Sequence, residues 1–275
     1  MGTVLAISSQ VARGHVGLNA IVPALQALGH EVIALPTVML SSHPGHGRVA
    51  GQRIDPALLG EMLATLDGHG WLTSVDAVVS GYLPTPAHVA VVAEAITRVR
   101  AHRSSALYFC DPVLGDDPKG LYIAEDAARA LATELVPRAD FAFPNRFELT
   151  WLSGLPVSDS AGARAAARSI AAKRTVATSI PQAESGLATL AIGPEGTWQI
   201  SVARQEQVPN GTGDLLTGLM AGYIVGGQDI PSALGAAVGA LEGAIEISVG
   251  RDELQLVAAL RSFSGYRGRP VEALS

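Results

Sequence analysis

The residues best suited to chemistry form a glycine-flanked turn, Gly211-Thr212-Gly213-Asp214, followed by an apolar run of small residues. The run predicts a helix that extends to about residue 225, so the turn forms the start of that helix. Backbone N–H groups at a helix start lack intrahelical partners, and together with the helix dipole they attract an anion. An acid in the first turn would lie beside this anion and could accept a proton from a neighbouring hydroxyl. The turn therefore indicates phosphoryl transfer.

The same turn also has a purely structural interpretation. A helix that starts at a glycine is stabilised by an acid in its first turn, whether or not a ligand binds there. The helix N-terminus should also lower the pKa of Asp214, which is the wrong direction for a base. In a loose transition state, however, the proton leaves late, and orientation of the hydroxyl matters more than basicity. The turn alone does not separate the two interpretations.

The elements that must position this turn alternate along the chain. Short apolar runs predict strands at residues 4–8, 31–36, 75–80, 106–110, 140–143, 175–179, 187–192 and 197–202. Helical periodicity predicts helices at residues 18–28, 56–66, 85–102, 124–135, 161–172, 212–225, 231–249 and 253–263. This order predicts an α/β fold with a mainly parallel sheet, and Pro194-Glu195-Gly196 predicts an antiparallel edge hairpin. We expect one domain over residues 1–264 and a loose C-terminal tail over residues 265–275.

The composition narrows the class of partner. Of the 275 residues, 48% are hydrophobic and 16% are charged, which suits one large domain with a buried core. The net charge is −6 and the basic residues form no cluster, so we expect neither nucleic acid nor a membrane as a partner. No uninterrupted apolar run reaches the roughly 18 to 20 residues of a membrane span. Because Cys110 is the only cysteine and the N-terminus opens directly into a strand, we expect a cytoplasmic protein that binds small molecules.

Polar residues follow several of the predicted strands. Ligands of open parallel sheets bind outside the carboxyl ends of the strands, and long loops in compact domains are usually functional. The loop predicted over residues 37–53 is such a loop. The polar residues that follow strands are Ser9, Gly81-Tyr82, Asp111, Asn145 and Thr178-Ser179.

Taken in order, several segments resemble the pyridoxal kinases of the ribokinase superfamily. The resemblance covers residues 3–260 and implies a ribokinase-like three-layer α/β/α fold. It implies transfer of the ATP γ-phosphoryl group to the 5′-hydroxyl of pyridoxal, and of pyridoxine or pyridoxamine, in vitamin B6 salvage by a homodimer. The segments are Ser8-Ser9-Gln10-Val11, Arg13-Gly14-His15-Val16-Gly17, Thr37-Val38-Met39, Ser41-Ser42-His43, Ser80-Gly81-Tyr82, Cys110-Asp111-Pro112-Val113-Leu114-Gly115-Asp116, Pro144-Asn145-Arg146-Phe147-Glu148, Thr178-Ser179 and Gly211-Thr212-Gly213-Asp214.

The resemblance implies roles for the phosphate side of the site. Asp214 is the expected base, and the amides of Gly211, Thr212 and Gly213 face the transferring phosphoryl group. Asp116 and Glu148 are the expected contacts of Mg²⁺ through water. The expected ATP-binding residues are Asp111, Asp116, Lys119, Asn145, Glu148, Thr178, Ser179 and Thr212.

Each of these roles has a plainer alternative. Asn145 and Glu148 also fit a helix N-cap with its capping-box acid, and both interpretations can hold at once. Asp111 before a proline also fits an Asx-turn. Lys119 equally fits a solvated loop charge.

The resemblance also implies a vitamin-binding side. Its members are two hydroxyl residues, three apolar residues and one histidine, a mixture that suits a mostly apolar pocket with few polar groups. The alternatives for Tyr82 and His43 are a half-buried rim aromatic and a loop histidine bonded to backbone. The expected substrate-binding residues are Ser9, Val16, Val38, Leu40, His43 and Tyr82, together with Asp214.

Three positions depart from the family pattern and leave the substrate open. Leu40 stands where an aromatic ring often stacks on the pyridine, and Pro44 replaces a common threonine. Phe143 replaces a threonine oxygen, which puts a K⁺ site in doubt. The alternatives are a hydroxymethyl-pyrimidine kinase of the same fold, a non-catalytic vitamin-binding protein and a dehydratase-like relative.

Overall fold

The computed structural model describes residues 1–183, 186–263 and 268–274. Its strands are β1 (Thr3–Val11), β2 (Glu31–Leu40), β3 (Gly51–Arg53), β4 (Val75–Ser80), β5 (Leu107–Cys110), β6 (Gly115–Asp116), β7 (Gly120–Leu121), β8 (Phe141–Ala142), β9 (Thr175–Pro181), β10 (Gly186–Gly193), β11 (Gly196–Ala203) and β12 (Glu272–Leu274). Its α-helices are α1 (Leu18–Ala27), α2 (Pro56–Gly68), α3 (Pro86–His102), α4 (Glu125–Ala130), α5 (Arg146–Ser153), α6 (Ser160–Ser169), α7 (Thr212–Val225), α8 (Ile230–Glu246) and α9 (Leu256–Phe263). Shorter turns of helix are η1 (Pro44–His46), η2 (Trp71–Ser74), the π-helical η3 (Leu131–Leu135) and η4 (Val136–Arg138).

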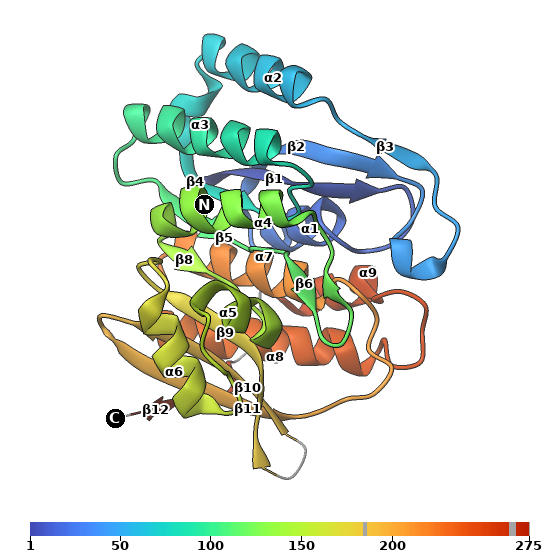
Figure 1. The fold of residues 1–275 in the computed structure, drawn as a ribbon, viewed down its shortest axis with the longest axis vertical. Helices are drawn as coiled ribbons and strands as arrows, with labels where there is room; N and C mark the ends of the chain where they lie inside the picture. The colour runs from blue at the N-terminus through green and yellow to red at the C-terminus, as the bar shows by residue number, and fades with distance from the viewer. Residues whose placement is uncertain (184–185, 264–267, 275) are drawn as a thin grey trace.

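One sheet organises these elements. Its strand order is β12-β11-β10-β9-β8-β5-β4-β1-β2-β3, and β6 and β7 form a separate antiparallel ribbon. The pairs from β2 to β9 are parallel, whereas β3 and the strands β10 to β12 run antiparallel to their neighbours. The C-terminus therefore lies beside β12, at the opposite edge from β3 (Figure 1). The predicted α/β class, the mainly parallel sheet and the β10–β11 hairpin are confirmed.

Helices cover both faces of the sheet and enclose two cores. One core holds Leu63 of α2, Val92 of α3 and Ala163 of α6 against the sheet. The other holds Ile21 of α1 and Leu219 of α7, together with residues of α8 and α9. Burying each such leucine or isoleucine contributes about 1.5–3 kcal/mol relative to exposure. The arrangement is the predicted three-layer α/β/α fold, and none of the helices described is long and apolar enough to cross a membrane.

Helix α7 is buried on all sides. Two of its glycines allow α1 to approach it closely. A β-carbon at Gly218 would lie 3.0 Å from the Ile21 Cα, and one at Gly222 would lie 2.6 Å from Leu28 Cδ1. Larger residues at either position would push the two helices apart. Tight packing of α1 on α7 therefore fixes where the N-terminus of α7 points.

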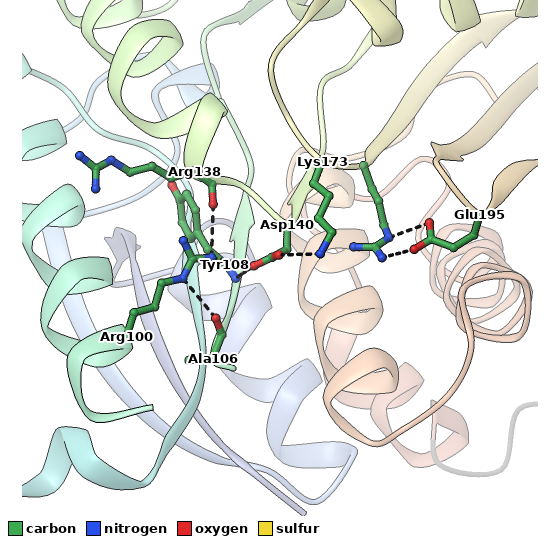
Figure 2. Close-up of polar contacts among 8 residues, drawn as sticks. Arg100, Ala106, Tyr108, Arg138, Asp140, Lys173 and Glu195 are labelled. Atoms are coloured by element: carbon green, nitrogen blue, oxygen red, sulfur yellow. Dashed lines mark hydrogen bonds and ion pairs between the residues drawn. The ribbon is translucent and has the colours of Figure 1, made fainter. Parts of the chain in front are cut away.

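A polar network joins the amino ends of the strands, on the side away from the rim of polar residues (Figure 2). Asp140, just before β8, accepts hydrogen bonds from Arg100 Nη2 at 2.7 Å and from the Tyr108 backbone N–H at 2.9 Å. Lys173 Nζ, before β9, lies 3.8 Å from the other oxygen of Asp140. One carboxylate thereby aligns β5, β8 and β9, whose opposite ends carry the candidate site.

Three of the local predictions need correction. The loop predicted over residues 37–53 is largely a hairpin, because β2 continues to Leu40 and pairs with β3. The helix predicted over residues 124–135 changes from α to π geometry after Ala130. The tail is not loose throughout, since β12 pairs with β11, while residues 265–267 and 275 lie outside the described residues. The extension of β2 is held by its edge partner β3, and β12 is held by β11, which lies far away in the sequence. In both cases the partner strand supplies the hydrogen bonds, and the composition of the segment itself does not encode them.

Candidate active site

The glycine turn forms the N-terminus of α7 in a conformation that only glycine permits. Gly211 has a φ of 99°, and a β-carbon there would lie 1.9 Å from the carbonyl oxygen of His15. Thr212 is the first residue of α7, and Asp214 lies in the first turn. The first N–H groups of α7 have no partner within the helix, and they lie beside the carboxylate of Asp214.

The carboxylate of Asp214 has a raised pKa, opposite to the direction expected from the helix dipole. Burial among protein atoms raises the pKa of Asp214 to about 6, although part of the side chain stays accessible to solvent. A hydrogen bond from the backbone N–H of Gly17 opposes this rise. Desolvation therefore outweighs the local field of the helix start. The group is ionised at neutral pH and can accept a proton.

The carboxyl end of β4 approaches Asp214 through a second glycine. A β-carbon at Gly81 would lie 3.8 Å from Asp214 Oδ1 and only 2.4 Å from Ser8 Oγ. The same serine hydroxyl accepts a hydrogen bond from the Tyr82 backbone N–H at 3.1 Å. β1 and the carboxyl end of β4 are thus joined close to Asp214, and only a glycine fits at position 81.

Asp111, directly after β5, lies on the other side of the turn. Its carboxylate is 6% exposed and accepts a hydrogen bond from Thr217 Oγ1 at 3.1 Å. A β-carbon at Gly213 would lie 3.9 Å from the same Asp111 oxygen. Burial, followed by the charges of Glu148 and Asp214, raises the pKa of Asp111 well above its usual range. The structure therefore brings Asp111 to the turn.

Asn145 and Glu148 form the capping box that the sequence allowed. The Asn145 side chain accepts from the Glu148 N–H at 2.9 Å, and Glu148 Oε2 accepts from the Asn145 N–H at 2.9 Å. Glu148 Oε1 accepts from the backbone N–H groups of Leu114 at 2.8 Å and Gly115 at 3.4 Å. Burial nevertheless raises the pKa of Glu148 to about 7. The pair fixes the β5–β6 connection against α5.

Four carboxylates of this region lack a basic side chain as an ion-pair partner in the described segments. Asp111, Asp116, Glu148 and Asp214 make no ion pair with a basic side chain within the segments described. The charge of Asp116, which is exposed, is one of the causes that raise the pKa of Glu148. Carboxylates that lie close together without a basic partner can serve as ligands of a positive ion. Oxygen donors of this kind suit Mg²⁺.

The same acids do not form a direct metal cage. Among the described residues no group of three or more His, Cys, Asp or Glu side chains is arranged to hold a metal ion. Both oxygens of Glu148 already accept backbone hydrogen bonds. Mg²⁺ keeps several of its waters in phosphoryl-transfer sites, so the donor set fits an ion held largely through water and substrate phosphate.

Of the residues predicted for the substrate side, Val16 lies against the turn and Ser9 lies one contact away from it. A β-carbon at Gly211 would lie 3.2 Å from Val16 Cγ1, and Val16 is 5% exposed. Ser9 does not follow β1 but lies within it, and a β-carbon at Gly17 would lie 2.3 Å from Ser9 Oγ. The β1–α1 connection therefore brings one apolar side chain to the turn, and its Gly17 contacts the Ser9 hydroxyl.

The remaining substrate candidates come from the β2–β3 hairpin and the end of β4. Val38 is buried and pairs with Arg53, and the side chain of Leu40 is partly exposed. Burial raises the pKa of Tyr82, and the nearby charge of Arg53 opposes the rise. Tyr82 thus lies beside this hairpin as a half-buried aromatic of the rim.

The loop after β2 lies over the turn. A β-carbon at Gly45 would lie 2.8 Å from His43 Nδ1 and 3.3 Å from Asn210 Nδ2. His43 Nδ1 also accepts a hydrogen bond from the Gly45 N–H at 3.0 Å. The backbone-bonded interpretation of His43 is therefore confirmed, and the same residue sits next to the segment that leads into the turn.

The electrostatic environment of His43 includes Lys119, a second residue predicted for the site. Burial, His46 and Lys119 lower the pKa of His43, whereas Glu253 opposes the shift. Lys119, on the exposed tip between β6 and β7, therefore approaches the substrate loop. His43 is neutral at physiological pH, which suits a hydrogen bond to a neutral or anionic ring substituent.

Thr178 and Ser179 lie farther along the rim. Thr178 forms a bridge with Asn145, and its N–H donates to the Pro144 carbonyl at 3.0 Å. Ser179 is exposed with a φ of 59°, a left-handed conformation, at the register shift where β9 pairs with β10. No contact in the described part of the chain joins Ser179 to the turn.

Two buried residues contribute no ligand group. Phe143 packs its ring in the core, with its centroid 6.3 Å from that of Phe109, so it offers no oxygen to a cation. Burial raises the pKa of the Cys110 thiol to about 12. Cys110 is therefore an inert, buried residue of β5.

The sequence did not single out Gly17, Thr217 or Glu253 as functional residues. Thr217 had a usable signal, because it follows Asp214 by three residues and so shares a helix face with it. The other two had none, because the Gly17 N–H and the Glu253 carboxylate meet their partners only through folding.

The fold and the site together define a small-molecule kinase of the ribokinase type, with a glycine-entered helix start and a desolvated carboxylate at the rim of a mainly parallel sheet. The model of the phosphomethylpyrimidine kinase family matches residues 17–256. The chain is 36% identical over 281 residues to pyridoxal kinase PdxY of Deinococcus radiodurans, covering 96% of this chain and 93% of that protein. It is 35% identical over 268 residues to pyridoxal kinase PdxY of Rubrobacter xylanophilus, covering 94% and 92%.

A solved structure agrees over the full length. Pyridoxal kinase from Leishmania donovani in complex with ADP and pyridoxamine superposes with a TM-score of 0.94, covers 100% of both chains and is 28% identical. The chain therefore belongs to the phosphomethylpyrimidine kinase family and, within it, to the pyridoxal kinases. The resemblance predicted from the sequence is confirmed.

Proposed function

We propose that this kinase transfers the γ-phosphoryl group of ATP to the 5′-hydroxyl of pyridoxal, giving pyridoxal 5′-phosphate in vitamin B6 salvage. Pyridoxine and pyridoxamine are expected further substrates, because they carry the same hydroxyl. The observation that carries the proposal is Asp214, a carboxylate with a pKa of about 6 in the first turn of α7, beside free backbone N–H groups. Relatives with 36% and 35% identity that bear the name pyridoxal kinase support it.

The chemistry follows from what the turn can do. Asp214 accepts a hydrogen bond from the 5′-hydroxyl, orients its oxygen towards phosphorus and takes its proton as the P–O bond forms. The N–H groups of Gly211, Thr212 and Gly213 stabilise the equatorial oxygens of the phosphoryl group, and the dipole of α7 adds to this field. These groups are already oriented before substrate binds, because packing on α1 fixes α7.

The acids after β5 and at the start of α5 would serve the nucleotide and its metal. Asp116 and Glu148 would hold Mg²⁺ through water, and the ion would neutralise charge on the phosphates. Asp111 and Asn145 lie where ATP phosphates would approach the turn. Lys119, Thr178, Ser179 and the Thr212 hydroxyl are the further proposed ATP contacts. For K⁺, Asp111 and Thr178 offer oxygens and Phe143 offers none.

The vitamin would lie between the β1–α1 connection and the loop after β2. Ser9 and Tyr82 offer hydroxyls, Val16 and Val38 apolar walls, and His43 a neutral ring nitrogen. Leu40 would contact the pyridine ring without aromatic stacking. A hydroxymethyl-pyrimidine is the second candidate substrate, supported by the description of the matching family and by the missing aromatic residue.

A substrate panel tests the proposal. Purified protein with Mg-ATP is assayed with pyridoxal, pyridoxine, pyridoxamine and hydroxymethyl-pyrimidine at equal concentrations. We expect the highest kcat/KM with pyridoxal. Turnover of the pyrimidine alone would replace the proposed substrate, and absence of any turnover would favour a non-catalytic vitamin-binding protein. Asp214→Ala should lose most of the rate while still binding ATP, and a full rate would refute the assignment of the base.

The assembly and location are further proposals. We expect a homodimer, as in the family, which light scattering during size-exclusion chromatography would test. We expect a cytoplasmic location, which fits a single buried cysteine and can be tested by cell fractionation.

A further inference from the structure

The connection between α8 and α9 contacts the loop that follows β2. His46 Nε2 lies 2.8 Å from Glu253 Oε1, across 207 positions of sequence. The contact lies at the surface, and Glu253 is its more shielded partner: 28% of the His46 side chain and 12% of the Glu253 side chain are exposed.

The same carboxylate also rests on the β1–α1 connection. A β-carbon at Gly14 would lie 2.6 and 2.7 Å from the two carboxylate oxygens of Glu253, so only a glycine leaves them room. Gly14 has a φ of 109°, which also favours glycine. Three residues later, Gly17 donates its N–H to Asp214. Glu253 therefore touches both segments that flank the proposed vitamin site.

These two segments carry the proposed substrate contacts. The loop after β2 bears His43 and lies against Asn210 through Gly45. The β1–α1 connection bears Val16, which packs against Gly211. Glu253 itself makes no hydrogen bond to Asp214, Asp111 or Glu148 in the described segments. Its contacts therefore lie on the vitamin side and not on the phosphate side.

We infer that Glu253 is a positioning residue for the alcohol substrate: through His46 and the backbone at Gly14 it holds the two segments that bind the vitamin at a fixed separation. The inference rests on the proposed function. Loss of the carboxylate should loosen substrate binding and leave the phosphoryl-transfer step largely intact, because Glu253 makes no hydrogen bond of its own to Asp214 or to the turn in the described segments.

Kinetics test the inference with a matched control. Glu253→Ala should raise KM for pyridoxal about tenfold, with kcat and KM for ATP within twofold of wild type. His46→Ala should raise KM for pyridoxal in the same direction, and the double variant should be no worse than Glu253→Ala alone, since the contact with His46 is already lost in Glu253→Ala. Glu253→Gln keeps a hydrogen-bond acceptor and should recover most of the affinity. The control is Asp252→Ala. This neighbouring acid is 79% exposed, and its ion pair with Arg13 is long, at 3.9 Å.

Hydrogen exchange of the free protein separates this inference from the proposed function. Glu253→Ala should speed exchange of the amides of residues 41–50, and Asp252→Ala should not. If wild type phosphorylates no vitamin but the exchange difference appears, the proposed function fails while the positioning contact stands. Equal exchange in Glu253→Ala and Asp252→Ala would overturn the inference. So would a KM for ATP that rises as much as KM for pyridoxal, or independent effects of the two single variants.

Discussion

Replacing Asp214 by asparagine should make the protein more stable and nearly inactive. Burial raises the pKa of this carboxyl from 3.8 to about 6, so the folded state binds its proton more tightly than the unfolded state does. The stability that this group contributes is therefore fully present below pH 3.8 and is lost as the pH rises through about 6. Above that pH the folded protein carries a desolvated charge that an amide would not have.

The size of the effect follows from the shift. A difference of about two pH units at about 1.4 kcal/mol each gives up to about 3 kcal/mol of added unfolding free energy at pH 8. At pH 5 the wild-type group is mostly protonated when folded, so the gain should fall to roughly half. The asparagine oxygen can still accept the Gly17 N–H, so the hydrogen bond itself should survive. The rate should fall by about 10² to 10⁴, the usual worth of a general base.

Urea unfolding at pH 5 and pH 8, with activity measured on the same samples, checks this prediction. The variant should unfold at higher urea than wild type, with the larger difference at pH 8. A variant no more stable than wild type at pH 8, or a gain that is larger at pH 5, would refute the claim that Asp214 is a desolvated acid. An active variant would refute its role as the base.

Three further predictions concern the same site. The profile of kcat/KM against pH should fall on the acid side with an apparent pKa of about 6, because Asp214 must be ionised to act, and a fall centred near pH 4 would contradict this. Thr217→Val should raise KM for ATP several-fold but not KM for pyridoxal, because it removes the hydrogen bond that orients Asp111. Steady-state kinetics with each substrate varied in turn measure both constants, and an unchanged KM for ATP would mean that Thr217 only packs. Asn145→Ala should cost about 1 kcal/mol of unfolding free energy through loss of the helix cap, measured by urea titration, and no loss would mean that water replaces the cap.

Local patterns predicted most elements of the fold because each depends on its own residues. Alternating apolar runs and helical periods located the parallel strands and the helices that cover them, and Pro194-Glu195-Gly196 marked the β10–β11 hairpin. The extension of β2, the strand β3 and the C-terminal β12 escaped prediction. Each depends on a partner strand rather than on its own composition.

The sequence by itself determined the type of chemistry. A glycine turn followed by an acid, with polar residues after successive strands, predicts an anion site at one rim of a parallel sheet, because strand direction places those residues together. The departures at Leu40 and Phe143 were also visible in the sequence alone.

Only the tertiary structure decided how the site behaves. The helix start predicted a lowered pKa for Asp214, whereas burial raises it to about 6, because desolvation depends on atoms from distant segments. The capping box of Glu148 was predicted, but the burial that raises the pKa of this carboxyl to about 7 became visible only in the fold. The contact of Glu253 with His46 joins residues 207 positions apart, and no local pattern encodes such a distance. Burial and long-range contact are properties of the packed chain, so the sequence names the reacting groups and the fold sets their proton affinity and their position.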